Sequence, residues 1–386
     1  MTQGQQVDEQ GLQAARERLA RAVAVGEVPG AVALVAQGGR VVAHWAVGSA
    51  QVEPVSRPMQ PDTIFDIASL TKVVGGTSVV LRLIDERVWA LDDPVARFLP
   101  AFATGGHKRA ITLRHLVTHT SGLAPWAPVY AYCQDRAAVP AWLGRQELVA
   151  APGTVVGYSD LGFMLVGLLA ERVTGEPFDR LVAGAVVEPL RLPDTGYRPA
   201  ARLRSRVAAT ERGNGWEQGM CRDAGARFDG WRQNVTVGEV NDGNTHYALG
   251  GVSSHAGLFA TAVDLWRVAR MYMYPYPGGG AADAPPPFQP STLRLALADG
   301  TGGLTPPYGV GWALRPAFAP GLAPRSFGHT GFTGTSLAVD PDRALVVVLL
   351  TNRVHPEVRS RTDQGLRHDF HQMVLRAVPP GSADPG

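Results

Sequence analysis

A serine and a lysine three positions apart give this chain its clearest chemical signal. On a helix, Ser69 and Lys72 would lie on one face, one turn apart. From Leu70 onward, apolar and small residues recur at helical spacing, which predicts a buried central helix over 69–89. Burial disfavours the ammonium form, and a neutral lysine can accept the proton of a hydroxyl group. The pair is therefore a candidate nucleophile, although a serine that caps a helix and a lysine that reaches solvent would show the same spacing.

Two later groups of polar residues could join this pair. Tyr158-Ser159-Asp160 precedes an apolar helix predicted over 161–173, and Asp160 also suits the N-cap of that helix. His329-Thr330-Gly331 ends a strand predicted over 326–331, and a glycine there suits an edge strand that must approach a substrate closely. The ordinary interpretations are a core tyrosine, a capping aspartate and a hydrogen-bonded strand histidine.

Metal chemistry has weaker support in the sequence. His115 and His119 are four residues apart in a short helix predicted over 111–122, but no third ligand is apparent. We expect both to be structural hydrogen-bonding residues and not metal ligands. Cys133 and Cys221 have no metal-ligand spacing, and their pairing stays open.

The composition is that of an ordinary globular protein. The chain has 386 residues, 45% of them apolar, and a net charge of +2, which suggests neither a nucleic-acid partner nor a membrane partner. No apolar run is long enough to span a bilayer, and Met1–Gln10 lacks the apolar core of an export signal. The chain as it stands predicts a cytoplasmic protein, or a periplasmic or secreted one if a signal has been removed. The oligomeric state stays open.

Secondary-structure signals at both ends of the chain predict one sheet and an α+β fold. A helix over 12–23 and a hairpin over 30–48 open the chain. Four strands, over 308–314, 326–331, 334–339 and 344–350, and a helix over 366–377 close it. We expect an antiparallel sheet built from both ends and flanked by helices, with residues 12–67 and 250–379 forming a sheet subdomain. Residues 68–249 would form an inserted, mainly helical subdomain, with long loops and short strands over 202–247, and 274–290 would be a surface loop.

The three polar groups, in this order, resemble the motifs of the serine β-lactamase and penicillin-binding protein superfamily. A tyrosine in the second motif is similar to class C β-lactamases, low-molecular-weight penicillin-binding proteins and family VIII esterases. The stretches Thr112–Gly122, Gly238–Asn244 and Gly250–Phe259 strengthen the resemblance, which covers nearly the whole chain. It implies a β-lactamase-like fold and acyl transfer from a small-molecule or peptide substrate to the enzyme, with no metal and no organic cofactor.

The resemblance also implies roles for individual residues. Ser69 would attack a carbonyl, and Lys72 and Tyr158 would accept and transfer the proton of its hydroxyl group. Which of these two is the acylation base stays open. The backbone amides of Ser69 and Phe332 would hold the oxyanion. The substrate-binding positions would be Asp160, His329, Thr330 and Gly331.

Two positions depart from the motifs of the superfamily. His329 replaces a lysine, and because histidine is mostly neutral near pH 7, its pull on a substrate carboxylate is weaker. Asp160 replaces an asparagine, so two amide donors are lost where a substrate amide oxygen is usually held. We therefore rank D,D-peptidase-like and esterase activities above efficient β-lactam hydrolysis.

Two other classes of function deserve comparison. A catalytically idle relative that binds a peptide or cell-wall fragment would have degraded motifs, whereas Ser69, Lys72 and Tyr158 are intact. An α/β-hydrolase would need a Gly-x-Ser-x-Gly pentapeptide, which the chain lacks. Loops around Tyr130, Trp216 and Trp231 are expected to shape the substrate pocket.

Overall fold

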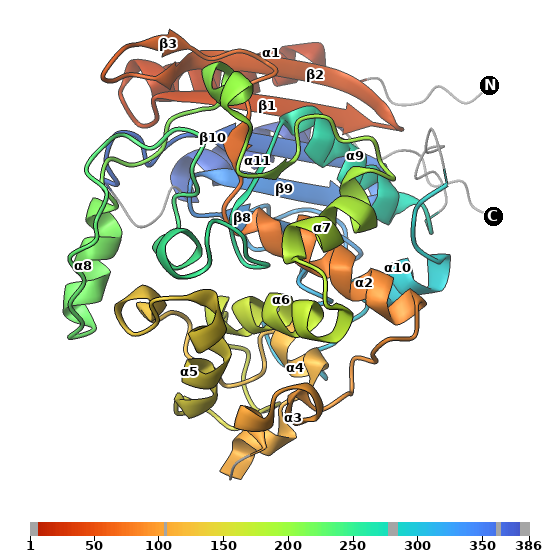
Figure 1. Cartoon of the computed structure of the whole chain (residues 1–386). Helices are drawn as coiled ribbons and strands as arrows, with labels where there is room; N and C mark the ends of the chain where they lie inside the picture. The colour runs from red at the N-terminus through yellow and green to blue at the C-terminus, as the bar shows by residue number, and fades with distance from the viewer. Residues whose placement is uncertain (1–6, 104–105, 277–284, 360–363, 379–386) are drawn as a thin grey trace.

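A seven-stranded antiparallel sheet organises the protein. The computed structural model describes residues 7–103, 106–276, 285–359 and 364–378. The strand order is β3-β2-β1-β10-β9-β8-β7, which places strands from the two chain ends side by side (Figure 1). The strands are β1 (Gly30–Gln37), β2 (Arg40–Gln51), β3 (Arg57–Pro58), β7 (Ala313–Leu314), β8 (Phe327–Gly331), β9 (Thr335–Asp340) and β10 (Leu345–Thr351).

The centre of the sheet joins the N-terminal hairpin to the C-terminal strands. β1 and β2 turn at Gly38 and Gly39, whose positive φ angles of 57° and 76° suit glycine. β1 then pairs with β10 in antiparallel register, Val32 opposite Leu350. The predicted hairpin and the α+β fold class, with an antiparallel sheet built from both chain ends, are confirmed.

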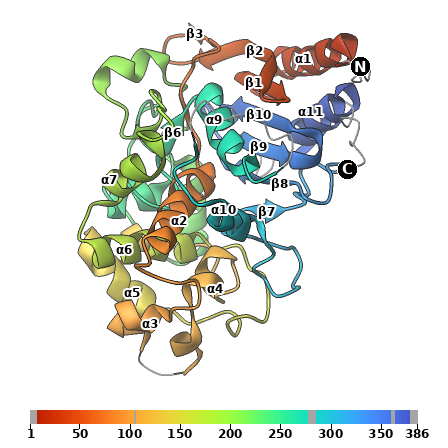
Figure 2. The same cartoon turned by 90° about the vertical axis from the view of Figure 1, so that its right-hand side faces the viewer.

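Alternating residues of β1 and β10 pack into two hydrophobic clusters, one on each face of the sheet. Ala31, Ala33 and Val35 pack on one face against α1 (Glu9–Ala24) and α11 (Gln364–Ala377). Val32 and Leu34 belong to the core on the other face, which α9 (Ala262–Met273) covers. Figure 2 shows α1 and α11 on one side of the sheet and α9 on the other. This side-to-side alternation is the two-residue period of a strand.

A helical region lies beside the α9 face of the sheet. Its centre is α6 (Asp160–Thr174), which is apolar almost all round and packs against the helix that follows Ser69. The helices outside the sheet layers are α2 (Thr77–Asp85), α3 (Val95–Phe98), α4 (Leu113–Val117), α5 (Val139–Arg145), α6 (Asp160–Thr174), α7 (Phe178–Val182), α8 (Gly215–Asp223) and α10 (Pro290–Leu297). A small sheet of β4 (Phe65–Asp66), β6 (Leu258–Ala260) and β5 (Gly196–Tyr197) connects the two regions. The boundaries 12–67, 68–249 and 250–379 stay a prediction.

The central helix and the short helix after it are shorter than predicted. The central helix contains a π-helical turn, Lys72–Gly76, and α2 ends at Asp85 instead of residue 89 because Arg87 adopts a left-handed conformation (φ 56°). The helix predicted over 111–122 is only α4, which ends at Val117.

Two other segments differ in kind from the prediction. Most of 308–314 is a loop, since Gly309 donates to the carbonyl of Trp312 and the apolar residues there are buried by loop packing. The region 202–247 contains α8 and none of the strands of either sheet. The predicted loop over 274–290 includes residues 277–284, which lie outside the described residues.

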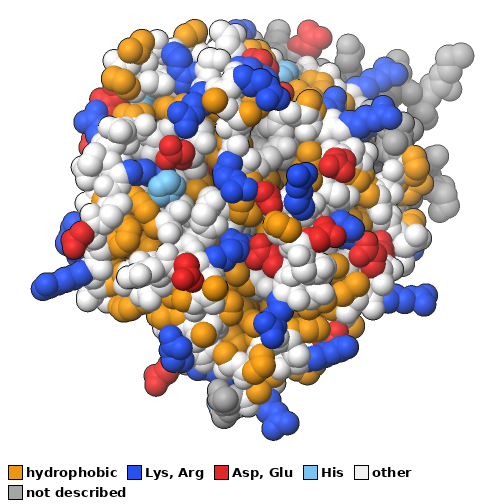
Figure 3. Space-filling view, in the orientation of Figure 1, with side chains coloured by type: hydrophobic (Ala, Val, Ile, Leu, Met, Phe, Trp, Pro, Cys, Tyr) orange, Lys and Arg blue, Asp and Glu red, His pale blue; other side chains and the backbone are white. Residues whose placement is uncertain are grey.

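The surface carries both signs of charge. On the face shown in Figure 3, blue and red side chains are interspersed over the molecule. Within the described residues, no helix combines the length and the apolar character needed to cross a bilayer.

Candidate active site

The backbone before Ser69 is held in a strained conformation. Ala68 has φ 46°, a left-handed value that costs a residue with a Cβ about 1–3 kcal/mol. The buried carboxylate of Asp66 accepts hydrogen bonds from the amides of Ala68 (2.8 Å) and Asn241 (2.7 Å) and fixes this turn. Burial nevertheless raises the pKa of Asp66 to about 6. The chain therefore presents Ser69 at a tight, braced turn directly before the central helix.

Lys72 is buried completely beneath Ser69. Its Nζ atom lies 3.0 Å from Ser69 Oγ, 2.6 Å from Asp160 Oδ1 and 3.1 Å from the carbonyl oxygen of His255. These three acceptors match the three protons that an ammonium group donates. The expectation of a buried lysine in contact with the serine is confirmed. Its counter-ion is Asp160, one of the two positions that depart from the motifs of the superfamily.

Asp160 is the first residue of α6 and not its cap. The N-cap is Ser159, whose hydroxyl accepts from the amide of Gly162 (3.1 Å). The carboxylate of Asp160 is thereby left to pair with Lys72. The interpretation of Asp160 as an N-cap is wrong, because the residue before it takes that position.

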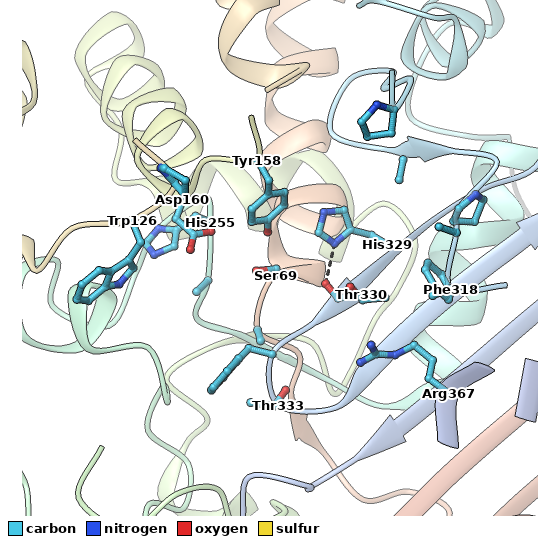
Figure 4. Close-up of a pocket in the computed structure, with 18 of the residues that line it drawn as sticks. Ser69, Trp126, Tyr158, Asp160, His255, Phe318, His329, Thr330, Thr333 and Arg367 are labelled. Carbon is cyan, nitrogen blue, oxygen red and sulfur yellow. Dashed lines mark hydrogen bonds between the residues drawn. The ribbon is translucent and has the colours of Figure 1, made fainter. Parts of the chain in front are cut away.

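Tyr158 lies against both members of the pair. Its side chain faces that of Ser69 (Figure 4), and Lys72 Nζ is 5.0 Å from the centre of its ring. Burial, and then the neighbouring charge of Asp160, raise the pKa of Tyr158 well above its usual range. Tyr158 is therefore a neutral phenol near pH 7.

His119 supports the ring of Tyr158 from behind. The two ring centres are 4.5 Å apart, and His119 Nδ1 accepts a hydrogen bond from the amide of Ser159 (3.1 Å). Burial, and then the charge of Lys72, lower the pKa of His119 well below its usual value. His115 accepts a hydrogen bond from the amide of Thr112 in the capping box of α4. The prediction that both histidines are structural hydrogen-bonding residues is confirmed.

Strand β8 passes close to the turn that carries Ser69. A Cβ atom at Gly331 would lie 2.5 Å from the carbonyl oxygen of Ile67 and would also meet the hydroxyl of Thr335, so only glycine fits. Phe332 follows at the end of the strand. Within the described residues, the backbone amides of Ser69 and Phe332 have no hydrogen-bond acceptor. Two such amides beside a nucleophile are the groups from which an oxyanion hole is built.

His329 is a neutral imidazole. Its Nδ1–H donates to the carbonyl oxygen of Thr330 (2.8 Å), which leaves Nε2 as a hydrogen-bond acceptor (Figure 4). Burial, and then the positive charge of Lys72, lower the pKa of His329 to about 3. The ring lies beside Tyr158, with 5.9 Å between ring centres. At this position the site therefore offers a substrate an acceptor where the superfamily motif has a cation.

One cavity of about 1040 Å³ brings these side chains together. Ser69, Tyr158, Asp160, His329, Thr330 and Phe332 all line it, whereas Lys72 lies beneath it and Gly331 shapes its wall. In Figure 4, Ser69 and Tyr158 face each other at the centre, with His329 and Thr330 on one side and Trp126, Asp160 and His255 on the other. The size suits a small peptide or an ester of comparable size.

Sequence reasoning missed several residues of this cavity. His255 and Asp242 are bonded to each other (Nε2 to Oδ1, 3.0 Å), and Glu211 and Glu217 line the same wall. Asp242 and His255 lie in Gly238–Asn244 and Gly250–Phe259, two stretches that support the family resemblance but to which it assigned no role. Glu211 and Glu217 lie outside both stretches. Among the aromatic residues expected to shape the pocket, Trp216 lines it, whereas Tyr130 and Trp231 pack into an aromatic cluster outside the lining.

The site contains no arrangement of metal ligands within the described part of the chain. No group of three or more His, Cys, Asp or Glu side chains there is placed to hold an ion. Cys133 and Cys221 are both buried and free.

Comparison with known proteins places this geometry in context. The model of the β-lactamase family matches residues 15–372. The chain is 31% identical over 317 residues to a candidate D-alanyl-D-alanine carboxypeptidase of Escherichia coli (strain K12), covering 77% of this chain and 70% of that protein. It is also 31% identical over 368 residues to the N-acetylmuramyl-L-alanine amidase of Bacillus subtilis (strain 168), covering 89% of this chain and 81% of that protein.

A solved structure shows the same fold. EstCE1, described as a hydrolase with promiscuous acyltransferase activity, superposes with a TM-score of 0.73. The match covers 95% of this chain and 98% of that one at 22% sequence identity.

Proposed function

This chain belongs to the β-lactamase family, and we propose that it is a serine hydrolase that forms an acyl-enzyme on Ser69. One observation carries the proposal: Lys72 is fully buried with its Nζ atom 3.0 Å from Ser69 Oγ, at the base of a cavity. A buried amine that contacts a hydroxyl has few structural purposes, whereas it is what an activated serine needs.

In the proposed acylation, protons move along the observed contacts. The proton of Ser69 passes to Lys72, whose own proton has first moved to Asp160 across the 2.6 Å contact. Ser69 Oγ then adds to the carbonyl carbon, and the amides of Ser69 and Phe332 hold the negative oxygen. We favour Lys72 over Tyr158 as the base because the raised pKa of Tyr158 keeps it a neutral phenol.

The same raised pKa suits Tyr158 to protonate the leaving group. Its hydroxyl lies beside Ser69, so it can donate to the departing oxygen or nitrogen and then recover the proton from Asp160 through Lys72. The net result is that Ser69 loses one proton, the leaving group gains one, and Lys72, Asp160 and Tyr158 return to their starting protonation states. A water molecule later hydrolyses the acyl-enzyme.

The substrate class we propose is a D-alanyl-D-alanine-type peptide, a related amide, or an ester. The two relatives at 31% identity are named as a candidate D-alanyl-D-alanine carboxypeptidase and an N-acetylmuramyl-L-alanine amidase, and both names describe amide hydrolysis, which favours the amide members of this class. Neutral His329 weakens the attraction for the carboxylate that every penicillin carries. We therefore propose slow acylation by β-lactams and faster turnover of substrates that place an uncharged group, instead of a carboxylate, against His329.

The test measures intact mass and turnover together. The protein is incubated with benzylpenicillin and, separately, with a p-nitrophenyl ester and a D-alanyl-D-alanine peptide. We expect an acyl adduct or steady hydrolysis with at least one of these, lost in Ser69→Ala and kept in Ser291→Ala, an exposed serine of α10 that serves as a control. Full activity of Ser69→Ala would refute the proposal.

The second candidate is a protein of this fold that only binds a cell-wall fragment. It would show no adduct and no turnover with any of the three compounds, and equal binding by wild type and Ser69→Ala. The intact contacts of Ser69 with Lys72 and Tyr158 favour the enzyme.

A further inference from the structure

Three carboxylates that the proposed mechanism does not use line the cavity of Ser69. Glu211 precedes α8, Glu217 lies within it, and Asp242 precedes the π-helical turn Asn244–Ala248. We call these three residues the acidic wall. Glu211 is 2% exposed and Glu217 is 8% exposed, so they are buried and still lie against the space where a substrate would bind.

Glu217 is incompletely satisfied. Its Oε2 atom accepts a hydrogen bond from the amide of Gly243 (2.7 Å). A Cβ atom at position 243 would lie 2.6 Å from both carboxylate oxygens, so this glycine allows the side chain to sit directly on the backbone. Among the described residues, Oε1 of Glu217 is buried and has no hydrogen-bond partner. Because buried carboxylates are normally paired, the free oxygen indicates a missing donor.

The other members of the wall already have partners. Asp242 binds His255 (3.0 Å) and the amide of Thr245 (2.7 Å), and Glu211 accepts from the amide of Trp216 (2.6 Å). Oε1 of Glu217 takes part in none of these contacts and is the carboxylate oxygen of the wall that is left without a donor among the described residues.

The nearby protein cation is Arg232, which donates to the carbonyl oxygen of Asn241 (2.8 Å) and lies 4.0 Å from Glu239. Its charge acts to lower the pKa of Glu217 and of Glu211, but this effect is smaller than that of burial. Burial, and then the charge of Asp242, raise the pKa of Glu217 well above its usual range, and burial also raises the pKa of Glu211. A positively charged group that binds in the cavity would stabilise the ionised form of these buried carboxylates.

We infer that the acidic wall binds a positively charged group, a primary ammonium or a guanidinium, on the acyl portion of the substrate. The orientation follows from the site, since the leaving group must face Tyr158, and Tyr158 lies beside His329. The acyl portion then extends away from His329, past Trp216 and Met220, which line the cavity beside the acidic wall and would cover its aliphatic part. This inference rests on the proposed function, of which it names the substrate class.

The test compares esters that differ only in a terminal group. The p-nitrophenyl esters of ω-aminohexanoate and heptanoate have the same length and leaving group, but one ends in an ammonium and the other in a methyl group. The esters of ω-aminooctanoate and nonanoate extend the comparison by two methylenes. We expect kcat/KM to be at least about tenfold higher for the ammonium ester at one of the two lengths, as a charge-assisted hydrogen bond would give.

Two variants assign the preference to the acidic wall. Glu217→Gln and Glu211→Gln keep the shape of each side chain and remove its ability to ionise against a bound cation, and each should reduce the ammonium-to-methyl ratio toward one. Glu188→Gln removes a charge from an exposed residue outside the cavity lining and should leave the ratio unchanged. A wild-type ratio of one or less at both lengths would overturn the inference, and so would a ratio that persists in both wall variants.

Binding separates this inference from the proposed function. Calorimetry on Ser69→Ala measures the affinities of the N-methyl amides of ω-aminohexanoate and heptanoate without any turnover. Tighter binding of the ammonium ligand, reduced in Glu217→Gln on the same background, supports the acidic wall even if no ester is hydrolysed. Equal affinities overturn the inference even if Ser69 proves to be the nucleophile.

Discussion

His371 should make the folded protein sensitive to mild acid. It lies on α11, and its ring is buried, with Nε2 3.1 Å from the hydroxyl of Ser336 and the ring centre 5.3 Å from that of Phe318. Burial, and then the charges of Arg367 and His368, lower the pKa of His371 from 6.5 to about 3. In the unfolded chain, this histidine therefore binds a proton as the pH falls below 6.5. In the folded chain, it stays neutral until about pH 3.

The magnitude follows from this difference in pKa. Over the window from 6.5 down to about 3, the free energy of unfolding falls by about 1.4 kcal/mol per pH unit for this one group. Between pH 7 and pH 5 the loss is about 2 kcal/mol, a large share of the ~5–15 kcal/mol that stabilises a typical protein. Above pH 6.5 the group contributes no further change.

Urea unfolding at pH 7 and pH 5 measures this loss. In His371→Gln, where the amide can still bond Ser336, the difference in unfolding free energy between the two pH values should shrink by about 2 kcal/mol. His107→Gln replaces an exposed histidine and should leave the difference as in wild type. An unchanged difference in His371→Gln would show that the buried ring is not the acid-sensitive group.

Three predictions concern the site. Gly331→Ala should lower kcat by about 10²–10³, because the new methyl group would collide with Thr335 and displace one oxyanion amide; normal acylation kinetics would contradict the close approach of β8. Asp160→Asn removes the charge that helps to raise the pKa of Tyr158, so the alkaline limb of the pH profile of kcat/KM should move to lower pH; an unmoved limb would exclude Tyr158 as its source. His329→Lys should speed acylation by benzylpenicillin about fivefold or more relative to a neutral ester, and a constant ratio of the two rates would show that position 329 does not face the carboxylate.

Contacts between residues close together in the sequence could be predicted from the sequence. Ser69 and Lys72 meet because a helix fixes residues three apart on one face, and the contact of 3.0 Å follows from that local rule. The contact between Lys72 and Asp160 joins residues 88 positions apart, so no spacing rule predicts it. The neutrality of His329 was expected only as a general property of histidine, and its cause, burial beside Lys72, required the fold.

The missed helix α8 illustrates a second limit. Its inward-facing residues are Glu217 and Cys221, four apart, while two glycines and several polar residues make up most of the rest. A search for apolar periodicity passes over a helix whose buried stripe includes an acid. The acidic wall could not be predicted from the sequence either. Its members come from separate segments, and in the sequence each looks like an ordinary solvent-exposed charge.

The pairing of β1 with β10 imposes an order on biosynthesis. The strand that completes the hydrogen bonding of β1 leaves the ribosome roughly 300 residues later, which at ~5–20 residues per second is about 15–60 s. During that interval the N-terminal hairpin has an open edge and two apolar faces, a surface that other chains can join. The most central strand pairing of the finished protein is thus among the last to form, and the nascent chain needs protection until the C-terminal strands emerge.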